Sequence, residues 1–386
     1  MDELRLFGTP EVDLEDAAVI DDVRAMRVAL ADVLRVPRQW SGGLRRTTQA
    51  RAIRGSNTIE GYAVSAEDAV AAVDEEPPLS ADERTWVEIV GYRRVLTYIL
   101  RMAPESGFGV DSQLLRSLHF MLLEHDLVKD PGRFRAGAVY VADESTGEAV
   151  YEGPDAALVP GLVDLLARGL NTDRGEPMVD AAMAHLNLVM IHPFRDGNGR
   201  MARALQTLVM ARDQVLEPTF SSIEEWLGAN TEDYYRVLAL TGGGRWNPGN
   251  DAGLWVKFNL RAHHMQAQTL QRRFREAEAT WTAIDALIAE LGLAERVGNP
   301  LFDAILGYRV RRSGYVKRAG IEERTATRDL NQLVTAGLLD AVGQTRGRYY
   351  TASQRLRRIA IDARSDRAAL TDPYPWLPTR LRAGTS

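Results

Sequence analysis

Apolar residues recur at spacings of three and four along most of the first 290 positions, which is typical of amphipathic helices. Val23, Met26, Leu30 and Val33 form one such series, and several later segments repeat the spacing. The pattern therefore predicts a mainly α fold. The further helices that we expect are 86–100, 114–123, 157–166, 179–191, 201–209, 231–240 and 252–293.

Residues 131–154 interrupt the helical pattern. Apolar and polar residues alternate there on both sides of a turn rich in Ser, Thr and Gly, which predicts a β-hairpin at 137–152. After residue 300 the pattern changes again, to two short helices joined at Gly320 and two strand-like runs within 341–351. We therefore divide the chain into an N-terminal helical region (1–105), a core (106–265), a connecting helix (266–298), a small C-terminal domain (299–358) and an irregular tail (359–386).

The chain has 386 residues and no cysteine, which excludes disulfides, thiolate nucleophiles and metal centres with cysteine ligands. Its net charge is −6, which argues against a surface that binds nucleic acid throughout. The charge is uneven, because residues 301–358 contain twelve Lys and Arg but only five Asp and Glu. That segment carries +7 and leaves −13 for the rest of the chain.

The first residues are acidic and include Gly and Pro, whereas a secretory signal has a basic start and an apolar run. No segment approaches the roughly 18 consecutive apolar residues of a membrane helix. We therefore expect a cytoplasmic protein that does not enter a membrane.

The segment from His192 to Arg203 contains residue types that together suit phosphate chemistry. A helix should end near Ile191, because Pro193 disfavours the α conformation at His192 and has no amide hydrogen. His192 would then lie at a helix end, open to a loop, where it can act as a general base. Asp196 offers a hard carboxylate oxygen that can hold Mg²⁺ beside phosphates.

Gly197 and Gly199 bracket Asn198 just before the next helical run. Glycines at such a position let successive backbone amides converge on an anion at a helix N-terminus. Arg200 and Arg203 are three residues apart on the first turn, so both side chains would project from one face toward phosphate oxygens. A base, a metal carboxylate, an anion cradle and two arginines together indicate phosphoryl or nucleotidyl transfer.

The twelve residues HPFRDGNGRMAR at 192–203 resemble, at every defining position, the HxFx(D/E)GNGRxxR motif of the Fic family. Members of that family transfer AMP from ATP to hydroxyl side chains of proteins. The resemblance implies a Fic-type helical bundle with a β-hairpin flap, acting as a protein adenylyltransferase with ATP and Mg²⁺. It also implies that His192 deprotonates the target hydroxyl, that Asp196 holds Mg²⁺, and that Phe194 anchors the loop in the core.

The resemblance further assigns the nucleotide contacts. The amides of Gly197 and Gly199, together with Asn198, would stabilise the α-phosphate, and Arg200 and Arg203 would contact the β- and γ-phosphates. Position 199 is Gly, whereas the phosphotransferase branch of the family has Lys there, so AMP transfer is favoured over phosphorylation.

Two further segments resemble elements of that family. The hairpin at 137–152 resembles the flap that docks an extended segment of the target protein by main-chain pairing. Asn230, Tyr234 and Tyr235 lie in a segment similar to the one that flanks the adenine. Which tyrosine would face the nucleotide stays open, since adjacent residues on a helix point about 100° apart.

Residues Ser56 to Gly61 match the inhibitory motif of the family, [S/T]xxxE[G/N], whose glutamate pairs with the second arginine. The resemblance implies that Glu60 competes with the γ-phosphate for Arg203, so we expect an autoinhibited enzyme. In some members the same glutamate also helps to remove AMP, which leaves a de-AMPylating activity open. A helix that simply ends at Gly61 would explain the residues without any function.

The basic segment at 299–358 resembles a small winged helix-turn-helix domain, whose second helix could enter the major groove of DNA. Winged helices also bind proteins or dimerise, so a protein partner or a homodimer is the competing interpretation. The residues expected at a DNA surface are Arg324, Thr325, Thr327, Arg328, Arg346 and Arg348.

Two other functions stay open at this level. One is a nucleotide-sensing transcription regulator built on a Fic core, and the other is a Fic enzyme with a different nucleotide donor. The presence of His192 favours an enzyme, because a sensor has no need of a general base.

Overall fold

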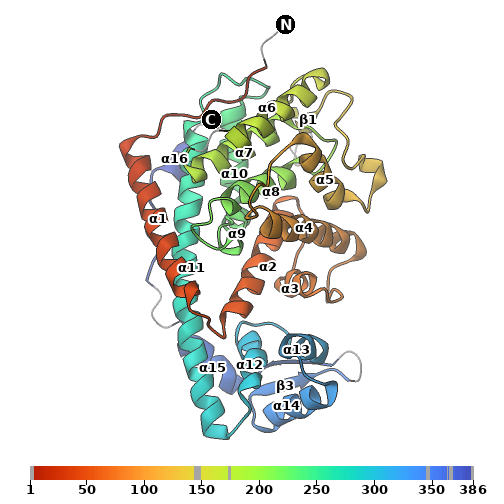
Figure 1. Ribbon diagram of the computed structural model, residues 1–386, viewed down its shortest axis with the longest axis vertical. Helices are drawn as coiled ribbons and strands as arrows, with labels where there is room; N and C mark the ends of the chain where they lie inside the picture. The colour runs from red at the N-terminus through yellow and green to blue at the C-terminus, as the bar shows by residue number, and fades with distance from the viewer. Residues whose placement is uncertain are drawn as a thin grey trace.

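The computed structural model describes residues 4–142, 149–172, 175–344, 348–362, 364 and 368–383, and it is mainly α-helical (Figure 1). A larger helical body and a smaller C-terminal unit share one long helix, α11 (Gly253–Leu291), which runs along one side of the molecule. The predicted mainly α fold is therefore confirmed. Within the described residues, no helix combines the length and the apolar character that crossing a membrane requires.

The larger body is organised around α7 (Pro177–Ile191) and α8 (Asn198–Ala211), which pack side by side. Twelve of the 15 residues of α7 are buried, so this helix lies in the middle of the body and its end is fixed on all sides. The surrounding elements are α4 (Glu83–Met102), α5 (Ser112–Leu123), α6 (Val159–Thr172), α9 (Glu224–Ala229), α10 (Thr231–Gly242) and the short turns η1 (Leu127–Lys129), η2 (Ala156–Leu158) and η3 (Pro218–Phe220).

Three N-terminal helices cover this body: α1 (Leu14–Arg35), α2 (Ser41–Ile59) and α3 (Ala66–Asp74). The carboxylate of Asp13 caps α1 by accepting a hydrogen bond of 2.9 Å from the amide of Asp16. α1 packs along α11, whereas α2 lies between the C-terminal unit and the body (Figure 1). The long helix predicted over 252–293 is present as α11, which runs without a break across residue 265, where we divided the core from the connecting helix.

The hairpin predicted at 137–152 is present as an antiparallel pair, β1 (Tyr140–Ala142) and β2 (Ala149–Glu152). Tyr140 pairs with Glu152 and Val141 pairs with Tyr151. The turn of the hairpin, 143–148, lies outside the described residues. The paired ends fix the base of the hairpin next to the C-terminal end of α7, because the Tyr151 hydroxyl donates a hydrogen bond of 2.8 Å to the carbonyl of Met190.

The C-terminal unit combines helices with a second two-stranded antiparallel sheet, in which Leu339 pairs with Ala352. Gly320 joins its second and third helices with a φ of 61°, a left-handed conformation that glycine adopts at little cost. The order of elements agrees with our prediction, and winged helix stays our interpretation of it. The elements are η4 (Glu295–Val297), α12 (Gly298–Ile305), α13 (Arg312–Ala319), α14 (Glu323–Thr335), β3 (Leu339–Val342), β4 (Tyr349–Ala352) and α15 (Gln354–Asp362).

The tail predicted to be irregular from residue 359 is helical in two places. α15 continues to Asp362, and α16 (Leu377–Ala383) packs against α10. Tyr374 is fully buried just before α16, and its hydroxyl donates a hydrogen bond of 2.6 Å to Asp16. The prolines suggested irregular chain, but Pro378 lies in the first turn of α16, where a helix tolerates proline.

Candidate active site

The loop between α7 and α8 carries the residues that the sequence singled out. His192 ends α7 in a left-handed conformation with φ of 49°, and Pro193 prevents the helix from continuing. The side chain of Asn198 closes the loop, because it exchanges two hydrogen bonds of 2.9 Å with the backbone of Phe194. We expected Asn198 at the α-phosphate, and the structure instead directs its buried side chain into the loop.

His192 is half-buried and arranged as a neutral base. Its Nδ1 lies 3.1 Å from the carbonyl oxygen of Val189, and because a carbonyl only accepts, Nδ1 carries the hydrogen. Nε2 therefore keeps its lone pair. Burial lowers the pKa of His192 from 6.5 to about 4, so the ring is neutral at physiological pH.

Two buried residues hold the loop that carries His192. Arg135 donates through Nε to the carbonyl of His192 at 2.8 Å, and its own amide donates to the carbonyl of Pro193 at 2.9 Å. His119 stacks on the ring of Phe194 with centroids 3.7 Å apart. Its Nε2 donates to the carbonyl of Asp196 at 2.9 Å. We did not predict either role, since both depend on contacts over more than 50 residues of sequence.

The glycine cradle lies at the start of α8, where Gly197 has φ of 76°. A methyl group built on Gly199 would come within 2.5 Å of Oε1 of Glu60, so the carboxylate of Glu60 lies directly against the cradle. The same oxygen lies 2.6 Å from Arg203, which is 1% exposed. An anion thus already occupies the place predicted for a phosphate, and it comes from the end of α2.

Arg203 has several partners besides Glu60. Its Nε donates to the hydroxyl of Ser56 at 2.8 Å and its guanidinium donates to the carbonyl of Ser56 at 3.0 Å. Burial alone would lower the pKa of Arg203, but the carboxylate of Glu60 outweighs it and the net shift is upward. The structure therefore contains the pair that we predicted between Glu60 and Arg203, and it adds the two contacts of Ser56, which we did not predict.

Arg200 is equally buried but has a different partner. It forms an ion pair with Glu88 of α4, which is 2% exposed, and its Nε has no hydrogen-bond partner among the described residues. Burial raises the pKa of Glu88, but Arg200 and Lys129 outweigh it and lower that pKa to about 2. We expected Arg200 to face phosphates, and the structure shows it held by a carboxylate that sequence reasoning missed.

Asp196 lies at the open side of the cradle with its side chain 40% exposed. One oxygen accepts from the amide of Gly197 at 2.6 Å, and the other lies 2.8 Å from Nζ of Lys129. No group of three or more His, Cys, Asp or Glu suited to a metal occurs among the described residues. A single accessible carboxylate fits Mg²⁺ bound jointly with nucleotide phosphates, which is the usual mode for this ion.

The predicted adenine segment divides into buried and exposed residues. Tyr234 is 1% exposed, and its hydroxyl lies 2.9 Å from Nε2 of His185 and 3.5 Å from Arg203. It is placed to support Arg203 rather than to stack on a base. Tyr235 is 48% exposed and its hydroxyl donates to the carbonyl of Ile59, while the side-chain Nδ2 of Asn230 donates to the carbonyl of Trp226. Of the two tyrosines, Tyr235 is the exposed one.

The Fic/DOC family matches residues 109–210, which include the loop and α8. The curated relatives include "Protein adenylyltransferase Fic" from Drosophila yakuba, which is 35% identical over 34% of this chain and 26% of that protein. The protein of the same name from Nematostella vectensis is 27% identical over 41% of this chain and 36% of that protein. The match thus spans only about a quarter to a third of the length of these relatives.

Two solved structures share the fold. A Fic family protein from Desulfovibrio desulfuricans G20 superposes with a TM-score of 0.56 and 22% identity, covering 90% of this chain and 98% of that chain. A Fic domain containing signaling protein from Bacteroides thetaiotaomicron superposes with a TM-score of 0.51 and 18% identity, covering 65% of this chain and 96% of that chain.

Proposed function

Because this chain belongs to the Fic family, we propose that it is a protein adenylyltransferase, which transfers AMP from ATP to a Tyr, Ser or Thr hydroxyl of a protein. The observation that carries the proposal is a neutral His192 whose Nε2 keeps its lone pair, on the loop that leads into the glycine cradle. A base and an anion site on one loop suit a hydroxyl that attacks a phosphate.

In the proposed reaction, Nε2 of His192 takes the proton of the target hydroxyl as its oxygen attacks the α-phosphorus. A phosphorus–oxygen bond to the target forms, the bond between the α-phosphorus and the bridging oxygen breaks, and pyrophosphate leaves with the electron pair. The amide of Gly199 would stabilise the charge on the α-phosphate oxygens, while the amide of Gly197 donates to the carboxylate of Asp196. Asp196 would hold Mg²⁺, which when bound offsets the negative charge of the phosphates.

We further propose that the chain as described is autoinhibited. The carboxylate of Glu60 lies against Gly199 and on Arg203, which supports a direct competition with the γ-phosphate. ATP would then be excluded or bound with its α-phosphate misaligned, and a misplacement of about 1 Å can cost roughly 100-fold in rate. Arg200 lies close enough to Glu60 to be affected by its charge, so a phosphate in that place would interact with both arginines.

The target protein is proposed to dock along the hairpin at 137–152. Tyr140 is 58% exposed and Val150 is 44% exposed, which leaves apolar surface for an extended segment beside the catalytic loop. The adenine is proposed to lie near Asn230 and the exposed ring of Tyr235. Two alternative activities of the same site are removal of AMP from the target and transfer from another nucleotide donor.

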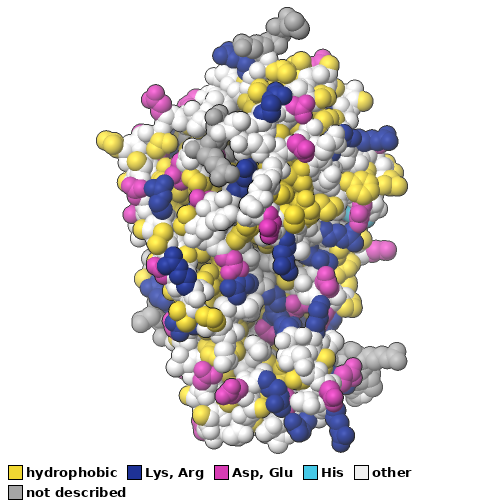
Figure 2. Space-filling model, viewed as in Figure 1, with side chains coloured by type: hydrophobic (Ala, Val, Ile, Leu, Met, Phe, Trp, Pro, Cys, Tyr) yellow, Lys and Arg dark blue, Asp and Glu magenta, His cyan; other side chains and the backbone are white. Residues whose placement is uncertain are grey.

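DNA binding by the C-terminal unit is a second proposal, favoured by one observation. An open hollow over α14 is lined by Arg312 of α13 and by Glu323, Arg324, Thr327, Arg328 and Asn331 of α14, so three of its six lining residues are arginines. Basic and acidic side chains are nevertheless interspersed over this unit in the space-filling view (Figure 2). Of the predicted wing residues, Arg346 lies outside the described residues. Salt-dependent binding of duplex DNA by the full chain, lost in Arg324→Ala with Arg328→Ala, would support this role.

The experiment that tests the main proposal is transfer of radiolabelled AMP by the full chain with Glu60→Gly, to itself and to proteins of a lysate. We expect incorporation that His192→Ala abolishes, while stabilisation of the protein by ATP remains. Labelling with other nucleotides and release of the label over time would identify a different donor or a reverse activity. Incorporation that survives His192→Ala would overturn the mechanism.

A further inference from the structure

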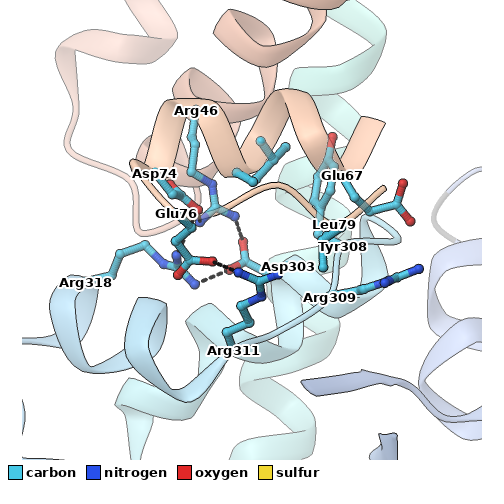
Figure 3. A pocket seen from close by; sticks show the side chains of 12 residues that line it. Arg46, Glu67, Asp74, Glu76, Leu79, Asp303, Tyr308, Arg309, Arg311 and Arg318 are labelled. Atoms are coloured by element: carbon cyan, nitrogen blue, oxygen red, sulfur yellow. Dashed lines mark hydrogen bonds and ion pairs between the residues drawn. The ribbon is translucent and has the colours of Figure 1, made fainter. Parts of the chain in front are cut away.

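Four charged residues form a closed ring where the C-terminal unit meets the N-terminal helices (Figure 3). Arg46 of α2 forms ion pairs with Asp303 of α12 and, at 3.3 Å, with Asp74 at the end of α3. Arg318 of α13 closes the ring, because it lies 2.8 Å from Asp303 and 3.2 Å from Asp74. Each charge thus has two partners of opposite sign, contributed by four different helices.

Three of the four side chains in the ring are largely buried. The side chains of Arg46 and Asp303 are 8% and 7% exposed, and Asp74 is 15% exposed. In Figure 3, Arg46 extends from α2 toward Asp303, and Arg318 approaches from the C-terminal unit. Because screening by water is weak there, loss of one charge leaves its partners poorly compensated. The ring therefore resists displacement of α2 against the C-terminal unit.

Apolar packing strengthens the same junction. Trp40 and Leu44, at the start of α2, belong to one buried cluster with Leu301 and Phe302 of α12. A methyl group on Gly43 would come within 3.1 Å of the ring of Phe302, so helix and ring are in close contact. The first half of α2 therefore packs against the C-terminal unit.

The other end of α2 reaches the active site. Ser56 and Glu60 bind Arg203, and they lie about 15 Å and about 21 Å along the helix axis from Arg46 at about 1.5 Å per residue. Between the two ends, Gly55 lies against the backbone of Glu224 in α9, where no side chain would fit. The helix therefore joins the C-terminal unit to the glycine cradle and is tightly supported in between.

We propose that Asp303 and Arg318 are positioning residues of the C-terminal unit, which keep α2 in place and so keep Glu60 in the cradle. The inference rests on the proposed inhibition by Glu60. A displacement of the unit that opens the ring would shift α2 and weaken the contact of Glu60 with Arg203. The C-terminal unit would then regulate nucleotide binding through its position relative to α2.

The test is Asp303→Asn in the full chain, which keeps the shape of the side chain and removes one charge of the ring. We expect the affinity for ATP with a fluorescent ribose label to rise about fivefold, the lower range of measured couplings between sites. Self-modification with labelled ATP should rise with it. An unchanged or lower affinity in a folded Asp303→Asn protein would overturn the proposal.

A double variant separates positioning from other effects. With Glu60→Gly already present, Asp303→Asn should add nothing, because the group that it releases is gone. A further fivefold rise in that background would show that the ring acts without Glu60 and would refute the inference. If no variant transfers AMP, including Glu60→Gly, then the proposed function fails, whereas the ATP affinities still decide whether the ring positions Glu60.

The matched control is Asp329→Asn. Asp329 is 1% exposed in the same unit and pairs with Arg296 at 2.7 Å and with the hydroxyl of Tyr315 at 2.9 Å. Both partners lie in the C-terminal unit, so Asp329→Asn should destabilise that unit without raising the affinity for ATP. A rise in ATP affinity equal to that of Asp303→Asn would contradict the proposal, because any destabilisation of the unit would then release Glu60. If Asp303→Asn does not fold, Arg318→Gln, at a side chain 29% exposed, takes its place with the same expected outcomes.

Discussion

The two arginines of the cradle have the same burial but are held in opposite ways. Arg200 pairs with Glu88, a carboxylate in the second turn of α4 that is 2% exposed and also lies 3.1 Å from Lys129. Arg203 pairs with Glu60, which follows the last turn of α2 and whose side chain is 21% exposed. The first carboxylate is enclosed by the body, whereas the second lies just past the end of a helix and is partly exposed. Burial of an arginine therefore does not decide whether its partner can be exchanged for a phosphate.

The largest expected effect comes from Glu60→Gly. Removing the carboxylate opens the cradle and frees Arg203, so AMP transfer should rise about 100-fold if misalignment of the α-phosphate is relieved. Self-modification with labelled ATP measures the change. A control is Glu232→Gly, since Glu232 is an exposed residue on α10 that pairs only with Arg236 among the described residues. If Glu60→Gly and the unaltered chain have equal activity, then Glu60 does not block Arg203, and the two arginines do not differ in whether their partner can be exchanged for a phosphate.

Glu88→Gln should act on stability instead. It removes the carboxylate that pairs with the buried Arg200, and breaking a buried ion pair typically costs about 3–5 kcal/mol of the free energy of unfolding. Urea unfolding followed by circular dichroism measures that loss. Activation comparable to that of Glu60→Gly would instead mean that Glu88 also competes with phosphate.

The pH dependence of the Glu60→Gly variant sharpens the role of His192. The pKa of His192 is about 4 with Glu60 in place, and removing the charge of Glu60, which raises that pKa, shifts it further down. The rate should therefore stay level as the pH falls from about 8 to about 5.5 and drop only near 4 or below. An unfolded His192 takes up a proton at higher pH than the folded one, so acid also lowers the free energy of unfolding. Circular dichroism at each pH separates the two effects. A midpoint near 6.5 would contradict the buried, neutral imidazole.

The smallest effect is expected from Tyr234→Phe. It removes the hydroxyl between His185 and Arg203, and one hydrogen bond is worth about 0.5–1.5 kcal/mol. In the Glu60→Gly background, ATP affinity should fall by about two- to tenfold. Tyr62→Phe is the matched control, because the ring of Tyr62 lies 5.7 Å from the guanidinium of Arg200 and stays in place. Equal losses in both would mean that the tyrosines do not distinguish the arginines.

Features that depend on neighbouring residues could be predicted from the pattern of the sequence, whereas contacts between distant residues could not. Periodicity located most helices of the body, and the alternating pattern located the hairpin, since both depend on neighbouring residues. The residues around the cradle were harder. Asn198 has its partner four residues away inside the loop, where a side-chain amide competes for backbone groups, and we assigned it to phosphate instead. The prolines of the tail led us to predict an irregular chain in place of α16. That helix is stabilised by burial of Leu377 and Leu381 against the body.

By itself, the sequence of this protein determined the local backbone of the site. Pro193 ends a helix, Gly197 allows the left-handed turn, and α8 starts beside it, whatever surrounds them. Only the tertiary structure decided which charges meet. Glu88 and Arg200 are 112 positions apart, and Glu60 and Arg203 are 143 apart. Helical periodicity assigns a side chain to a face but does not name its partner, because that depends on how distant helices pack.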